Sequence, residues 1–219
     1  YKDGRYLWWL DRITPGGYRN PYDPSVRPQV WRELVGVTVF PLHPQVYEYT
    51  RTRSDYGGQV TPPNIPLEKA FDKISFRENL HENGEFFLLD GYARGKHLHY
   101  DGNCIIKFYA DGQDWLIDGD YLVRNTTDHN GVSVIRDGRC DQLIPPCVAL
   151  ENFADLPSAS MTQTVVYDYN GVDWIRDIFW LKGEFVLVMD RMRAREAGDY
   201  TFVGNWKTLA DGDQDLRDG

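Results

Sequence analysis

The sequence lacks the features that mark a membrane-spanning or exported chain. It holds no apolar run approaching about 18 residues, so no segment is predicted to cross a membrane. No succession of basic, apolar and small residues opens the chain, so no signal peptide is predicted. The serine elbow of hydrolases, the phosphate-binding loop and the dinucleotide-binding glycine motif are missing as well. The enzyme classes that depend on these motifs therefore have no support in the sequence.

Cysteine and positive charge are both scarce. Cys104, Cys140 and Cys147 allow at most one disulfide bond, and their spacing matches no zinc finger or redox motif. The 24 Lys and Arg residues stand against 33 Asp and Glu residues, which gives a formal net charge of −9. This balance argues against general nucleic-acid binding, because such binding draws its affinity from neutralised phosphates.

The chain has the aromatic content and the length of a folded protein. Aromatic residues make up 14% of the sequence, which excludes a disordered, solvating chain. A length of 219 residues permits one large domain or two small ones. A chain of this size buries roughly 70% of its unfolded surface, so it can form a core without disulfide bonds.

Helical periodicity is confined to residues 1–36. The apolar stripe that carries it consists of Tyr6, Leu7, Trp9, Leu10 and Ile13. The sequence TPGG at 14–17 ends this helix, and a second short helix is predicted from about Arg27 to Leu34. Because the pattern is already under way at Tyr1, we expect the chain to be a fragment or a processed product of something longer.

From residue 37 onward, the sequence predicts an antiparallel β-sandwich. Short runs rich in β-branched and aromatic residues alternate with Gly, Asp, Asn and Pro, without helical spacers between them. The predicted strands are 37–40, 45–50, 69–78, 84–90, 97–110, 114–118, 130–137, 162–169, 173–182, 184–193 and 200–209. Tight hairpins are predicted at 109–113 and 180–184. The fold class is therefore mainly β, a multi-strand sandwich at 37–219 preceded by a helical segment at 1–36.

The pattern HLHYD at 97–101 is the strongest chemical signal. On a strand, His97, His99 and Asp101 would share one face. A hairpin would return Asp118 alongside His99, and His129 opens the strand after that. Two histidines and a carboxylate, His99, His129 and Asp118, form an open three-ligand set that suits zinc. The competing interpretation is a solvent-facing polar strip with no ligand.

These segments together resemble the heparinase II/III-like family of polysaccharide lyases. The matching stretches are 95–121, 128–138 and 176–192, and the resemblance extends over about residues 70–206. It implies a helical toroid joined to a C-terminal antiparallel supersandwich, with 1–36 as the tail of the toroid. It also implies a structural zinc at His99, Asp118 and His129, with His97 as the active-site histidine. The family's catalytic tyrosine belongs to the toroid, upstream of this chain.

The resemblance implies cleavage of a uronic-acid-containing polysaccharide by β-elimination. Arg94 and Lys96, beside His97, are expected to meet a substrate carboxylate or sulfate, unless they belong to a solubilising loop. The upstream helical region is the expected partner, and the family's location is periplasmic or secreted. The alternative function is a non-catalytic carbohydrate-binding or scaffolding sandwich that keeps the metal for stability alone.

Overall fold

A computed structural model gives the fold of most of the chain. The structure describes residues 4, 5, 7, 8, 25, 27, 29, 30, 34–54, 58–93, 99–118, 125–140 and 143–208. These divide into two compact units, Tyr1–Val35 and Gly36–Gly219. No helix among the described residues is long and apolar enough to span a membrane.

The first unit contains the beginning of the predicted apolar stripe. Its residues 4, 5, 7 and 8 are helical, and Leu7 is buried. The predicted second helix is wrong at Arg27, Gln29 and Val30, which have no regular secondary structure. The amide of Gln29 donates instead to the carbonyl of Gly4, 2.8 Å away. The sequence supplies a reason, because a residue directly before proline, here Arg27, is driven out of the helical conformation.

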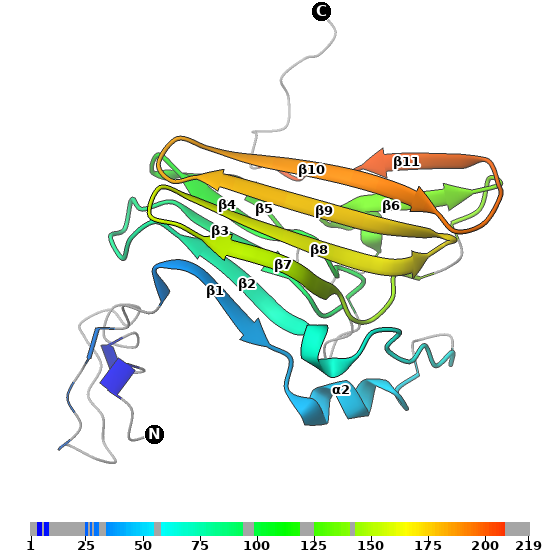
Figure 1. Cartoon of the computed structure of the whole chain (residues 1–219), viewed down its shortest axis with the longest axis horizontal. Helices are drawn as coiled ribbons and strands as arrows, with labels where there is room; N and C mark the ends of the chain where they lie inside the picture. The colour runs from blue at the N-terminus through cyan, green and yellow to red at the C-terminus, as the bar shows by residue number, and fades with distance from the viewer. Residues whose placement is uncertain are drawn as a thin grey trace, which may run out of the picture. The chain divides into compact units, whose positions relative to one another are not determined.

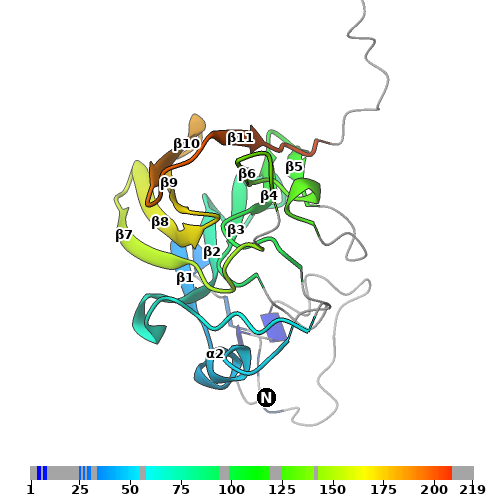
Figure 2. The same cartoon turned by 90° about the vertical axis from the view of Figure 1, so that its right-hand side faces the viewer.

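The second unit is built of antiparallel strands. They are β1 (Gly36–Pro41), β2 (Phe71–Arg77), β3 (Phe86–Asp90), β4 (Ile105–Ala110), β5 (Gln113–Ile117), β6 (Val132–Arg136), β7 (Ala149–Asp155), β8 (Ala159–Tyr169), β9 (Val172–Leu181), β10 (Phe185–Ala194) and β11 (Tyr200–Gly204). One sheet has the order β1-β2-β3-β4-β5 and a second the order β10-β9-β8-β7, while β11 pairs with β6. Figures 1 and 2 show the two larger sheets as facing layers.

The apolar core lies between these layers. Ile74 and Leu89 of the five-stranded sheet belong to the same buried cluster as Trp174 and Ile178 of β9. The rings of Phe76 and Trp180 meet edge to face across the layers, with centroids 6.1 Å apart. Along β9, the side chains at even positions from 172 to 180 are all buried, which is the alternation of a sheet with one face in a core. The predicted antiparallel β-sandwich is confirmed.

Both predicted hairpins form, with the residues in the turns that the sequence suggested. Asp111 and Gly112 both have positive φ, 53° and 77°, as the two central residues of a type I′ hairpin turn between β4 and β5 require. The β9–β10 turn closes with a hydrogen bond from the Glu184 amide to the Leu181 carbonyl, 3.0 Å long, and Gly183 takes the positive φ of 75°.

The predicted strand at 45–50 is wrong, because this segment is helix α2 (Pro44–Thr50). Pro44 stands in the first turn, where its missing N–H costs nothing, and the His43 side chain caps the helix by accepting from the Gln45 amide. Tyr47 and Thr50 are the buried residues, and their spacing of three is that of a helix face. Strand β7 was missed, because it is an edge strand whose residues 152–155 are exposed.

Candidate metal centre

Two connections at one end of the five-stranded sheet bring the predicted histidines together. The β3–β4 connection carries His99 and Asp101, and the β5–β6 connection carries Asp118 and His129. The other predicted site residues, His97, Arg94 and Lys96, lie outside the described residues.

The segment that precedes β4 is a turn and not the predicted strand. Residues 99–104 are irregular, and β4 begins only at Ile105. The amide of Cys104 donates to the carbonyl of Asp101 at 2.9 Å, and Asn103 adopts a left-handed φ of 65°. Asparagine tolerates this conformation better than most residues do. The turn, rather than strand alternation, therefore places Asp101 near His99.

Asn130 ties the second connection to the sheet. Its buried side-chain amide donates to the carbonyl of Ile105 at 2.9 Å and to that of Ile117 at 3.1 Å. Ile105 begins β4 and Ile117 is the last residue of β5, directly before Asp118. His129 is the neighbour of Asn130 in the chain, so these two hydrogen bonds hold its backbone beside both strands. The turn hydrogen bond from the His129 amide to the Thr126 carbonyl, 3.3 Å, fixes the other side.

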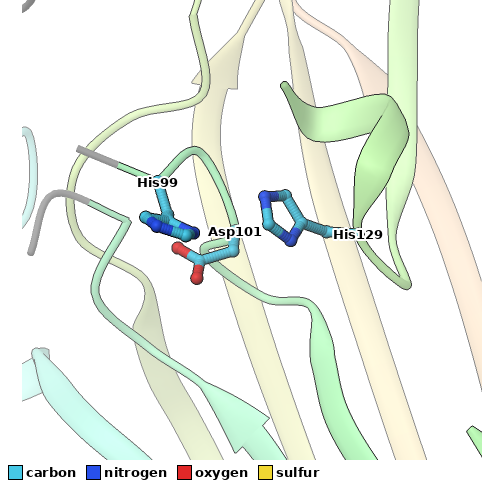
Figure 3. A group of neighbouring side chains, drawn as sticks. All are labelled: His99, Asp101 and His129. Atoms are coloured by element: carbon cyan, nitrogen blue, oxygen red, sulfur yellow. The ribbon is translucent and has the colours of Figure 1, made fainter. Parts of the chain in front are cut away.

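His99, Asp101 and His129 form a compact group of possible ligands. One ligand atom from each residue lies within 4.8 Å of those from the other two. The centroids of the two imidazole rings are 5.7 Å apart. Figure 3 shows the His129 side chain facing those of His99 and Asp101, which come from one segment, while His129 comes from another. His129 is fully buried, and Asp101 is nearly so.

Asp118 contacts this group through Nδ1 of His129. Its carboxylate lies 2.6 Å from Nδ1 of His129, within a charge-assisted hydrogen bond. If Nδ1 donates the proton, the neutral ring carries its lone pair on Nε2. Nε2 of His129 is buried and has no hydrogen-bond partner among the described residues. A carboxylate that orients a histidine in this way is the usual outer partner of a metal-binding imidazole.

The structure thus brings together three of the predicted residues in a modified arrangement. His99 and His129 lie side by side as predicted from the sequence, and Asp118 touches His129. Asp101 joins the two histidines, although the sequence argument placed it on the polar face without counting it as a ligand. The sequence signal that could have identified Asp101 as a possible ligand is its place as the third polar residue of the HxHxD pattern at 97–101.

Carboxyl groups in and beside this group influence one another's pKa values. Burial raises the pKa of Asp101, and the Asp118 carboxylate adds to the rise against the opposing effect of His129. Burial and the nearby Asp101 also raise the pKa of Asp90, although Lys73 is 2.9 Å away. Burial lowers the pKa of His129, but the hydrogen bond and the charge of Asp118 outweigh it, so the net pKa is raised. A bound cation would stabilise the charged form of buried carboxyl groups whose pKa values are raised in this way.

The residues present fit a zinc ion. Imidazole nitrogen and carboxylate oxygen are ligands that zinc accepts, and the group includes a buried ring nitrogen, Nε2 of His129, without a hydrogen-bond partner among the described residues. Sulfur is a weaker candidate, because burial raises the pKa of the neighbouring Cys104 thiol well above its usual value. No disulfide bond joins the three cysteines, all of which lie within the described residues.

Comparisons with known proteins bear on the fold. No protein-family model and no curated protein matches the sequence. Heparan sulfate lyase HepC from Pedobacter heparinus is similar over 66% of this chain and 24% of its own, with 18% identity and a TM-score of 0.49. A structure of heparinase III is similar over 64% of this chain and 24% of its own, with 15% identity and a TM-score of 0.47.

The chain spans about a quarter of the length of these solved structures. At such identities the likeness concerns the fold and not the chemistry.

Proposed function

We propose that the chain is part of a polysaccharide lyase that cleaves a uronic-acid-containing polysaccharide by β-elimination, with a structural zinc ion in its sandwich. The observation that carries the proposal is the convergence of His99, Asp101 and His129, of which His99 is two residues from His97 in the sequence. The complete enzyme would also include an upstream helical region that supplies a tyrosine, and it would be periplasmic or secreted.

Zinc would be held by His99 and His129 together with a carboxylate. The sequence predicts Asp118 as this carboxylate, whereas we propose Asp101, with Asp118 as the group that orients His129; the proximity of Asp101 to both histidines and the Asp118–His129 hydrogen bond support this choice. When bound, the ion would stiffen the connection that carries His97 and would take no part in the chemistry.

In β-elimination, a base removes the proton next to the sugar carboxylate, and the glycosidic oxygen leaves. His97 is proposed to take part in this proton transfer, because imidazole exchanges protons near neutral pH and such help is worth about 10²–10⁴-fold. The proton becomes acidic enough only when the carboxylate charge is neutralised, and Arg94 and Lys96 are proposed to meet that carboxylate.

The test is an assay of the full-length parent protein on a panel of uronate polymers, following the ultraviolet absorbance of the unsaturated product. His97→Ala should lower turnover about 10²–10⁴-fold and leave zinc content intact, whereas His99→Ala should lower the zinc content. His81→Ala, at an exposed turn position, is the control and should change neither. A parent protein that cleaves none of the polymers would refute the lyase proposal.

One observation favours the alternative, a carbohydrate-binding sandwich without catalysis. A cavity of about 320 Å³ is lined by Asn64, Ile65, Pro66, Lys69, Tyr167, Asp168 and Arg195. Tyrosine and polar side chains around a cavity of this size are suited to a sugar unit. Binding of the polymers without any cleavage, lost in Tyr167→Ala and kept in His97→Ala, would support this second function.

A further inference from the structure

A buried arginine, Arg176, links β9 to the two connections that carry the candidate metal centre. Arg176 lies on β9, in the sheet opposite His99 and His129, and its side chain is fully buried. Its guanidinium grips the carboxylate of Asp190, the residue directly opposite it on β10, with Nε–Oδ1 and Nη2–Oδ2 distances of 2.8 and 2.9 Å. This leaves Nη1 free to reach the other sheet.

Nη1 of Arg176 binds the two segments that carry the site. It donates to the carbonyl of Asn103 at 2.7 Å and to the carbonyl of Asn130 at 3.2 Å. Asn103 is two residues after Asp101, and Asn130 directly follows His129. One guanidinium group therefore links the two connections at the positions where each turns toward the metal centre.

The surroundings fix the guanidinium in this orientation. The indole N–H of Trp174 donates to Oδ1 of Asp190 at 2.7 Å, so the carboxylate is held from a second direction. Trp174 also lies under the guanidinium, with Cζ of Arg176 4.8 Å from the ring centroid. On the far side, Thr164 donates its hydroxyl to Oδ1 of Asn103 at 2.6 Å.

The stability of the fold does not by itself explain a buried ion pair such as Arg176–Asp190. Removing a guanidinium and a carboxylate from water carries a large desolvation penalty, and packed apolar residues often serve as well or better. The planar guanidinium group has five N–H donors in fixed directions, which an apolar side chain lacks. It can therefore fix the distance between the Asp190 carboxylate and two backbone carbonyl groups. In this chain those two carbonyls belong to the segments of Asp101 and His129.

We propose that Arg176, anchored by Asp190, is a positioning residue for the metal centre: it sets the spacing between the connection of His99 and Asp101 and that of His129. The inference rests on the proposed zinc site for its functional meaning. The clamp between the two segments is a separate physical claim that does not require the metal.

The test uses Arg176→Lys in the 219-residue chain, since lysine keeps the charge and lacks the fork. Two controls match it. Arg191→Lys alters an exposed Arg–Asp pair on the outer face of the same sheet, where Arg191 binds Asp177. Ile178→Val trims a fully buried side chain on the inner face of β9, two residues from Arg176. Zinc affinity is measured by competition with a chromophoric chelator, and amide hydrogen exchange is measured in parallel.

Arg176→Lys should weaken zinc binding about 10- to 100-fold, as is typical when support behind a ligand is lost, while both controls stay near the unaltered chain. Amides of 103–105 and 129–131 should exchange faster in Arg176→Lys, with those of 185–189 unchanged. If Arg176→Lys does not fold, Asp190→Asn, which loosens the same anchor, should give both effects.

Two results would overturn the inference. One is a foldable Arg176→Lys or Asp190→Asn chain whose two site segments exchange as slowly as those of Arg191→Lys. The other is a zinc affinity that falls no further than in Ile178→Val, which would make the arginine an ordinary core residue. If no chain binds zinc, the proposed metal site fails, and the exchange data alone decide whether the clamp exists.

Discussion

Replacing His99 with alanine should remove the stabilisation that zinc gives to the sandwich. At a free zinc concentration about 100 times the dissociation constant, a bound ion stabilises the folded state by about 2.7 kcal/mol. For a chain of this length, each kcal/mol shifts Tm by about 2–4 °C. Adding a chelator should therefore lower the Tm of the unaltered chain by about 5–11 °C.

His99→Ala should have a lower Tm in zinc than the unaltered chain and should respond little to the chelator. His99 is only partly buried, so the loss of packing is small and the metal dominates the result. Scanning calorimetry with and without chelator gives the shifts, and elemental analysis gives the zinc content. The control His81→Ala should behave like the unaltered chain. A His99→Ala chain with full zinc content and an unchanged chelator response would refute the reasoning.

Two further predictions concern carboxylates. If Asp101 is the ligand and Asp118 the orienting group, Asp101→Asn should lose zinc, whereas Asp118→Asn should keep it with an affinity lowered about 10- to 100-fold; the reverse order in a zinc titration would assign the ligand to Asp118. Burial raises the pKa of Asp173, but hydrogen bonds from Arg193 and Arg195 outweigh this effect and hold the pKa below its usual value. A depressed pKa stabilises the fold above about pH 4 and ceases to do so as the pH falls through the folded value. The Tm difference between the unaltered chain and Asp173→Asn should thus shrink in acid, and a difference that is the same at pH 7 and in strong acid would contradict the assignment.

The sequence predicts the sandwich well wherever a strand has one buried face. Along β9 the alternation of buried and exposed side chains gives both the strand and its orientation. The failures have local causes. QVYEYT alternates like a strand, but Pro44 and the cap of His43 start a helix there. Strand β7 has little apolar alternation to detect, because its outer end is exposed.

The candidate site was predictable in part. The close spacing of His99 and Asp101 in the chain, together with the hairpin that returns Asp118, pointed to a cluster. The turn at Asn103 was not anticipated, and without it Asp101 could not be counted as a ligand. Arg176 begins the stretch 176–192 that carries the family resemblance, but the alternation of apolar and polar residues does not predict that a charged side chain is buried. Its partner Asp190 follows only from the register across the β9–β10 hairpin.

The zinc K-edge X-ray absorption spectrum of the purified 219-residue chain would show whether His99 and His129 bind the same ion. We expect one zinc ion per chain with two imidazole nitrogens at about 2.0–2.1 Å, the remaining ligands being oxygen. A first shell containing sulfur, or a chain that takes up no zinc after dialysis against it, would contradict the convergence of His99 and His129 on a common ion.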